Sequence, residues 1–193
     1  SPPHIQQARV AMTSDALSPE DVWLLPGWQN SDPGHWQSLW QEQYGYQRLE
    51  QHSWQHPLRG DWSIRLQETV LDAPAPVTLV AHSLGCVLVA WWAAHSQVAR
   101  SKVRGALLVA PGDTEQESLR GVLPGWSPVL LQKLPFPSIL VGSENDPNCS
   151  VARAQAMAQG WGSRFVNAGA AGHINTASGL GLWEAGHELL LSL

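Results

Sequence analysis

Cysteine is almost absent from the sequence. The 193 residues include only Cys86 and Cys149. Two cysteines are too few for the network of disulfides that stabilises many small secreted domains. They are also too few for a metal site built from thiolate ligands, and we expect no metal or other cofactor.

Charged residues are scarce as well, and no hydrophobic run is long. Charged side chains make up 14% of the chain, and 16 acidic residues outnumber 11 basic ones, which gives a net charge of −5. Nucleic acids and anionic membrane surfaces are recognised by a basic face, so neither is an expected partner. A membrane-spanning helix needs roughly 18 consecutive apolar residues, and no segment approaches that length.

The first 20 residues lack both a clear periodicity and the apolar core of a secretory signal. We predict a loose N-terminal lead over residues 1–20, in which Met12 is a candidate for the natural start. Without a secretory signal, the expected location is the cytoplasm.

From residue 21 to residue 193, short apolar runs alternate with amphipathic stretches. This alternation is typical of a parallel sheet covered by helices. We predict one α/β domain, a three-layer sandwich whose mostly parallel sheet of about six strands has helices on both faces. The predicted strands are 22–25, 46–52, 77–81, 103–110, 138–141 and 163–166, and the predicted helices are 35–44, 59–71, 85–99, 151–159 and 180–191.

One strand-to-helix turn carries a serine between small residues. A buried strand ends at Ala81, the turn His82-Ser83-Leu84-Gly85 follows, and the next run is almost wholly apolar. This pattern predicts a nucleophile elbow, the sharp turn that exposes a serine above the sheet in α/β-hydrolases. Ala81 departs from the glycine that is usual two residues before the serine. We predict that Ser83 is a nucleophile.

A serine nucleophile needs a base, and the base needs an orienting acid, which lies between them in the chain order of α/β-hydrolases. Asp146 lies in a polar turn after the strand 138–141 and is the candidate acid. Glu144 in the same turn is the nearest alternative, and Asp113 after the preceding strand is the next. Asp146 could also serve only as a turn-former or helix cap.

The candidate base is His173. It lies in a loop rich in glycine and alanine after the last predicted strand, from which an imidazole can reach back over the sheet edge. His82, beside Ser83, is expected to pack against its neighbours rather than to act as the base. A bystander role for His173 is the alternative, because half-exposed histidines are common in loops.

The negative charge that develops on the substrate oxygen during such a reaction needs hydrogen-bond donors. The backbone N–H of Leu84, at the start of the helix after Ser83, is one candidate. The second is expected in the loop after the first strand, where Gly27 allows the backbone to turn inward. Trp28 N–H is our choice, and Gln29 N–H is the alternative.

Five short motifs include these candidate residues or lie near them in the sequence: LPGW at 25–28, DPGHW at 32–36, HSLG at 82–85, NDP at 145–147 and GHIN at 172–175. With them, the chain from about residue 21 onwards resembles compact α/β-hydrolase serine hydrolases of the retinoblastoma-binding protein nine type and their bacterial relatives. The resemblance implies a short hydrolase sheet, a triad of Ser83, Asp146 and His173, and esterase-like activity. The Leu-x-Cys-x-Glu motif associated with retinoblastoma binding does not carry over, because the nearest match, Leu84–Leu88, lacks the glutamate.

Together these features predict hydrolysis of a small carboxylic ester, or a related thioester or amide, through an acyl-enzyme on Ser83. Residues 113–135 are the one segment available for a lid, and they are too few for a cap domain, which favours a small substrate. The alternative is a catalytically idle hydrolase fold that serves as a protein-binding module. A nucleotide-binding domain is not expected, because no glycine-rich phosphate loop follows the first strand.

Overall fold

The computed structural model describes residues 17–193. Residues 1–16, which form most of the predicted lead and include Met12, lie outside the described residues. In the remaining part of that lead, Leu17 packs against the core, and Pro19–Asp21 (η1) forms a short 3₁₀ turn that enters the first strand.

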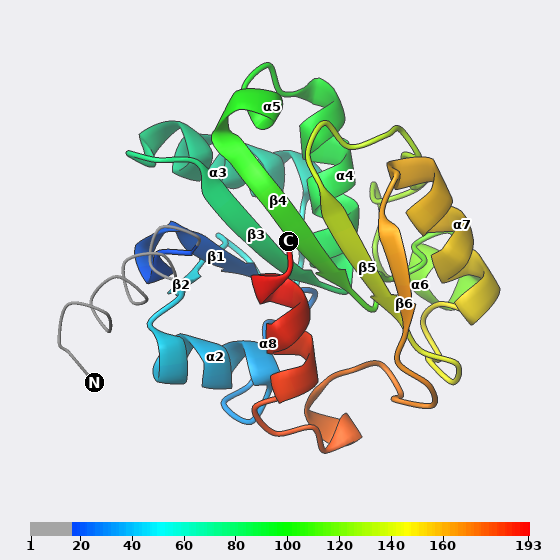
Figure 1. Ribbon diagram of the computed structural model, residues 1–193. Helices are drawn as coiled ribbons and strands as arrows, with labels where there is room; N and C mark the ends of the chain where they lie inside the picture. The colour runs from blue at the N-terminus through cyan, green and yellow to red at the C-terminus, as the bar shows by residue number, and fades with distance from the viewer. Residues whose placement is uncertain (1–16) are drawn as a thin grey trace, which may run out of the picture.

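A six-stranded sheet forms the centre of the molecule, and its five strand pairs are all parallel (Figure 1). The order across the sheet is β2-β1-β3-β4-β5-β6. The chain adds β2 on one side of β1 and then adds β3 and the later strands on the other side, so the strand order reverses between β1 and β3. The strands are β1 (Val22–Leu25), β2 (Gln47–Arg48), β3 (Val77–His82), β4 (Val103–Val109), β5 (Ser138–Gly142) and β6 (Arg164–Asn167). The predicted fold class is confirmed.

Helices cover both faces of the sheet and bury one hydrophobic cluster on each side. Because side chains alternate along a strand, Leu79 and Ala81 of β3 enter one cluster and Val80 enters the other. The first face is covered by α3 (Arg59–Asp72), α4 (Leu84–His95) and α7 (Val151–Trp161), and the second by α2 (Trp36–Tyr44) and α8 (Glu184–Leu191). Three short helices, α5 (Ala99–Lys102), α6 (Glu117–Arg120) and η2 (Thr176–Ser178), complete the described chain.

Several element boundaries differ from the sequence prediction, and two of these differences have an identifiable reason. The second strand, expected over 46–52, is reduced to β2, where only Gln47 and Arg48 pair with β1 at the edge of the sheet. The last helix was expected from residue 180 but begins at Glu184. Gly179 and Gly181 adopt left-handed backbone conformations, with φ of +68° and +57°, and such residues interrupt a helix.

Helix α4 approaches the sheet very closely, and Gly85 in its first turn makes this possible. A Cβ atom at Gly85 would lie 2.4 Å from the carbonyl oxygen of Leu25 on β1. The small residue two positions after Ser83 is therefore required by the contact between α4 and β1.

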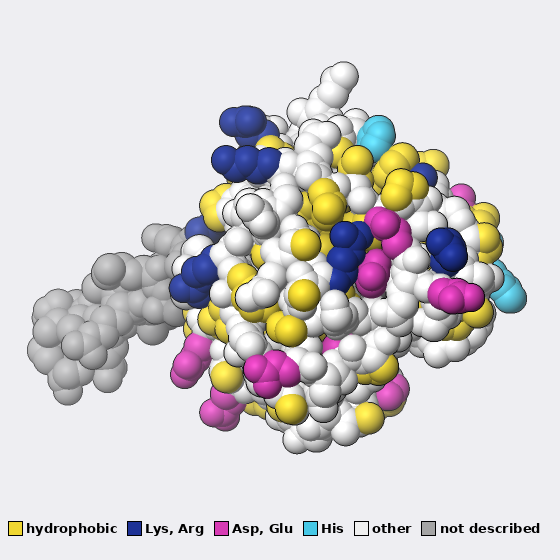
Figure 2. All heavy atoms as spheres, turned by 90° about the vertical axis from the view of Figure 1, so that its right-hand side faces the viewer, with side chains coloured by type: hydrophobic (Ala, Val, Ile, Leu, Met, Phe, Trp, Pro, Cys, Tyr) yellow, Lys and Arg dark blue, Asp and Glu magenta, His cyan; other side chains and the backbone are white. Residues whose placement is uncertain are grey.

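Two further observations concern the apolar length of the helices and the distribution of charge on one face. Within residues 17–193, no helix is both long and apolar enough to cross a membrane. On the face over α7 and β6, basic and acidic side chains are interspersed rather than gathered into a patch of one sign (Figure 2).

Candidate active site

The residues singled out in the sequence meet at the carboxyl edge of the sheet, beside the point where the strand order reverses. In open α/β sheets this is the place where ligands bind. Ser83 stands between the end of β3 and the start of α4, with φ of +56° and ψ of −117°. A serine in this region is strained by about 1–3 kcal/mol. This conformation is that of a nucleophile elbow.

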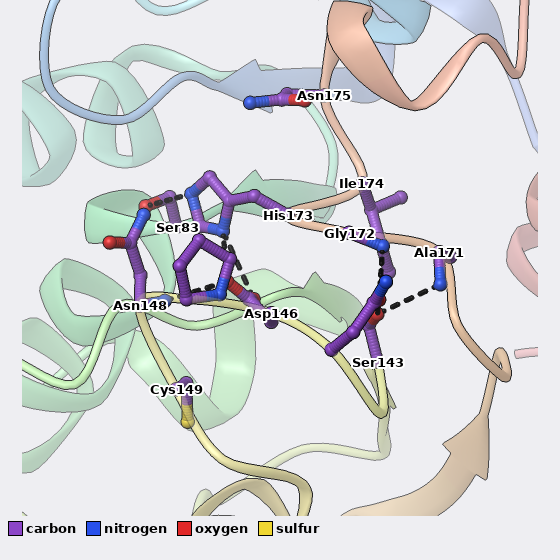
Figure 3. Close-up of polar contacts among 12 residues, drawn as sticks. Ser83, Ser143, Asp146, Asn148, Cys149, Ala171, Gly172, His173, Ile174 and Asn175 are labelled. Carbon is purple, nitrogen blue, oxygen red and sulfur yellow. Dashed lines mark hydrogen bonds and ion pairs between the residues drawn. The ribbon is translucent and has the colours of Figure 1, made fainter.

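The structure brings Ser83, His173 and Asp146 into direct contact (Figure 3). Ser83 Oγ lies 2.9 Å from His173 Nε2, and His173 Nδ1 lies 3.0 Å from each carboxylate oxygen of Asp146. Asp146 also accepts a hydrogen bond of 2.9 Å from the backbone N–H of Asn148. The Asp146 side chain is 2% exposed and that of His173 is 12% exposed. A neutral His173 that donates from Nδ1 to Asp146 can therefore accept the Ser83 proton at Nε2.

The alternative acids and the alternative base are engaged elsewhere. Glu144 is exposed and accepts a hydrogen bond from Asn167 Nδ2 at 3.0 Å. Asp113 forms an ion pair with Arg153, with 3.5 Å between Oδ1 and Nε. His82 donates from Nε2 to the backbone carbonyl of His173 at 2.9 Å and has no bond to Ser83 among those observed.

The loop between β1 and α2 runs directly beside the elbow. A Cβ atom at Gly27 would lie 3.0 Å from Ser83 Cβ and 3.1 Å from the backbone nitrogen of Leu84, so this close approach requires glycine. Gln29 N–H donates to the carbonyl of Trp54 at 3.0 Å, whereas the N–H groups of Trp28 and Leu84 have no acceptor among the described residues. Of the two alternatives for the second oxyanion donor, the geometry favours Trp28 over Gln29.

A cavity of about 240 Å³ opens beside Ser83. Gly112 borders it, and a Cβ atom there would lie 3.3 Å from Ser83 Oγ, so the missing side chain keeps the space above the hydroxyl open. Apart from His173, no lining residue carries a titratable side chain. The lining residues are Trp28, Gln29, Ser83, Leu84, Gly112, Thr114, Leu119, Leu123, Asn148 and His173. Trp36, Trp40 and Trp62 are not among these residues, because they are buried in the core.

Two residues of the acid-bearing turn have a role that the sequence analysis missed. Ser143 Oγ accepts a hydrogen bond from the backbone N–H of Ala171 at 3.0 Å (Figure 3). Asn145 Oδ1 accepts one from the backbone N–H of Gly172 at 2.7 Å. They tie the loop that carries His173 to the turn that carries Asp146. The polar composition of residues 143–146 was the only signal of this role in the sequence.

Neither cysteine is suited to chemistry, and the described residues contain no cluster of three or more histidine, cysteine or acidic side chains able to hold a metal ion. Cys86 and Cys149 are both buried. Burial raises the pKa of the Cys149 thiol to about 12 and raises that of Cys86 as well, so both stay protonated at neutral pH.

An elbow serine joined to a histidine and an aspartate on a parallel α/β sheet defines an α/β-hydrolase site. The model of the family described as "Serine hydrolase" matches residues 22–192, and the chain belongs to this family. Comparison with curated proteins found no match.

Solved structures with the same fold agree with this assignment. A YdeN-like hydrolase from Pectobacterium atrosepticum is 30% identical, with a TM-score of 0.80 over 96% of this chain and 95% of that one. The ydeN gene product of B. subtilis is 20% identical, with a TM-score of 0.73 over 90% and 97% of the two chains. Est1E from Butyrivibrio proteoclasticus, in a structure with ferulic acid bound, is 13% identical, with a TM-score of 0.68 over 89% and 88%. The last two likenesses show the fold alone.

A second histidine near the site, His35, is buried in its neutral form. It caps the N-terminus of α2, where its Nδ1 accepts a hydrogen bond of 3.0 Å from Gln37 N–H. Burial lowers the pKa of His35 to about 4, although the nearby carboxylate of Asp32 acts in the opposite direction. In the folded protein His35 therefore stays uncharged well below the pH at which an ordinary histidine takes up a proton.

We predict that this buried histidine makes the protein less stable in mild acid. The pKa of His35 is lower in the folded than in the unfolded chain, so between pH 6.5 and 4 the unfolded chain binds more protons. The free energy of unfolding should fall by about 2 kcal/mol from pH 7 to pH 5 because of His35 alone. His35→Asn, which retains an acceptor for the helix cap, should remove that part of the pH dependence in urea unfolding experiments. If the free energy of unfolding of His35→Asn depended on pH as strongly as that of the wild type, the lowered pKa of folded His35 would be contradicted.

Proposed function

We propose that the protein hydrolyses small, uncharged carboxylic esters through an acyl-enzyme on Ser83. The observation that carries the proposal is the continuous contact from Ser83 Oγ through the His173 imidazole to Asp146. Thioester and amide cleavage use the same chemistry and are close variants of the proposed reaction.

In the proposed mechanism, Ser83 Oγ attacks the carbonyl carbon of the ester while His173 Nε2 takes up the hydroxyl proton. The negative charge on the carbonyl oxygen is stabilised by the N–H groups of Leu84 and Trp28. The bond to the leaving oxygen then breaks, and His173 gives its proton to that oxygen. Water attacks the acyl-enzyme in the same way, and the acid product leaves. Throughout, Asp146 orients the imidazole and stabilises its charged form.

The cavity supports a small and uncharged substrate. At about 240 Å³ it is below the roughly 300–1,000 Å³ typical of sites for drug-sized ligands. Leu119 and Leu123 contribute apolar walls, and Thr114 and Asn148 contribute polar groups without charge. The lining contains no lysine or arginine that could form an ion pair with a substrate carboxylate or phosphate.

A catalytically idle binding module accounts less well for these observations. Such a role requires neither the strained backbone of Ser83 nor an imidazole held at hydrogen-bond distance from its hydroxyl. The finer resemblance to the retinoblastoma-binding protein nine type and the cytoplasmic location stay predictions.

The reaction can be tested with p-nitrophenyl acetate, butyrate and octanoate. The wild-type protein should cleave the acetate and the butyrate, with kcat/KM at least about tenfold lower for the octanoate, because the cavity is small. Ser83→Ala should lose turnover by a factor on the order of 10⁶, which brings it to the background rate. Ester cleavage that persists undiminished in folded Ser83→Ala protein would refute the proposal.

The position of the acyl group can be tested separately. Leu123 is 3% exposed and lines the cavity, so Leu123→Ala should enlarge it and raise octanoate turnover relative to acetate turnover. One or two methylene groups in an apolar pocket commonly change kcat/KM by about 10-fold or more. The matched control is Leu131→Ala, in the same segment but 39% exposed and outside the lining. Equal chain-length preference in the two variants would place the acyl group elsewhere.

A further inference from the structure

The loop that carries His173 has an unusual backbone. Between the end of β6 and the start of α8 it contains only one short 3₁₀ turn, η2. Ile174, directly after His173, has φ of +49°, and Gly172, directly before it, has φ of +61°. A left-handed conformation is ordinary for glycine but a genuine outlier for a β-branched residue such as isoleucine. A strained backbone of this kind persists only where surrounding groups hold it in place.

Side chains from three separate parts of the chain bind the backbone of this loop. Ser143 and Asn145 of the acid-bearing turn bind the N–H groups just before His173, as described above. From the other side, His82 Nε2–H donates to the carbonyl of His173 at 2.9 Å. Trp36 Nε1–H donates to the carbonyl of Ile174 at 2.8 Å. The carbonyl groups on both sides of the strained Ile174 φ angle are therefore held by ring N–H groups.

The two ring donors are themselves fixed in position. Trp36 is 1% exposed and His82 is 5% exposed. His35 lies between them, with its ring centroid 5.2 Å from that of Trp36 and 4.6 Å from that of His82. The His82 ring also packs 4.8 Å from the imidazole of His173. An indole N–H can only donate, and an imidazole nitrogen facing a carbonyl must carry the proton.

We propose that Trp36 and His82 are positioning residues, which hold the strained backbone around Ile174 so that the His173 imidazole points at Ser83. They touch neither the substrate nor the Ser83 hydroxyl and act through His173. The proposal rests on the proposed function, because it assigns them a part in the same reaction.

This role accounts for sequence motifs that the chemistry itself does not use. The motif at 32–36 ends in Trp36 and begins with Asp32, whose Oδ1 accepts hydrogen bonds from Thr176 Oγ1 and from Gly34 N–H. Thr176 follows Ile174 by two residues. Both ends of the motif thus contact the loop that carries His173. His82 of the HSLG motif contacts the same loop at the carbonyl of His173.

The chain provides a closely matched control for Trp36. Trp40 lies on the same helix, is 0% exposed, and also donates from its indole N–H to a backbone carbonyl of the C-terminal region. Its acceptor is Leu182, which lies nine residues beyond His173 and follows η2. Trp36→Phe and Trp40→Phe therefore each remove one indole hydrogen bond from a buried aromatic side chain, but only Trp36→Phe releases the carbonyl next to His173.

The experiment compares kcat, KM and the melting temperature of the wild type, Trp36→Phe and Trp40→Phe, with p-nitrophenyl butyrate as substrate. Both variants should melt at a lower temperature than the wild type. We expect Trp36→Phe to reduce kcat at least about tenfold with KM within about twofold, because a misplaced imidazole affects the chemical step. Trp40→Phe should keep kcat within about twofold of the wild type.

Equal kcat in the two folded variants would overturn the positioning role while leaving the proposed function intact. In contrast, a wild-type protein without activity, or activity that survives Ser83→Ala, would contradict the proposed function itself.

A second pair of variants, at His82, tests the positioning role if Trp36→Phe does not fold. His82→Gln places an amide N–H near the position of Nε2 and should retain most of kcat, whereas His82→Leu should lose at least about tenfold. Wild-type kcat in His82→Leu would overturn the proposal.

Discussion

The hydrogen bond between Ser83 Oγ and His173 Nε2 joins residues that are 90 positions apart in the chain. It forms because the fold brings the segments that carry these two residues together. Because all strands run parallel, the segments after β1, β3, β5 and β6 emerge at the same edge of the sheet. The first brings Trp28, the second Ser83, the third Asp146 and the last His173. The reversal of strand order between β1 and β3 places the candidate oxyanion loop directly beside the elbow.

Two strained residues lie on either side of this contact, and each is held differently. Ser83, with φ of +56°, is fixed by regular structure, since β3 ends before it, α4 starts after it, and its N–H donates to the carbonyl of Val109 at 3.0 Å. Ile174, with φ of +49°, lies in a loop and is held by side chains. The buried histidines that take part in this packing are kept neutral by burial, which lowers the pKa of both His35 and His82. The same packing that orders the site therefore makes the fold sensitive to acid.

Much of this arrangement could be predicted from the sequence because its signals are local. The elbow at Ser83 needs only a buried strand, a small turn and an apolar helix in succession, and the structure has this order. The chain order of hydrolase triads pointed to Asp146 and His173, which the structure places in contact with each other. Gly27 and Gly85 could be noticed as small residues, and the structure shows the atoms that require them to be small.

The groups that hold the loop could not be predicted in the same way. The indole of Trp36 contacts a carbonyl 138 residues away, and the DPGHW motif that ends in Trp36 does not indicate which distant backbone group the indole binds. The acceptor roles of Ser143 and Asn145 depend on where a distant loop passes, so the polar composition of their own turn does not reveal them. The second strand was predicted too long for a related reason: edge pairing depends on the neighbouring strand rather than on its own residues.

The central claim is that Ser83 is an activated nucleophile, and covalent labelling with a fluorophosphonate probe tests it most directly. The probe reacts with activated serines and requires no assumption about the natural substrate. The account predicts one adduct per molecule, located on Ser83 by mass spectrometry of the digested protein and absent from folded Ser83→Ala. Folded wild-type protein that stays unlabelled, or an adduct on a different residue, would contradict it.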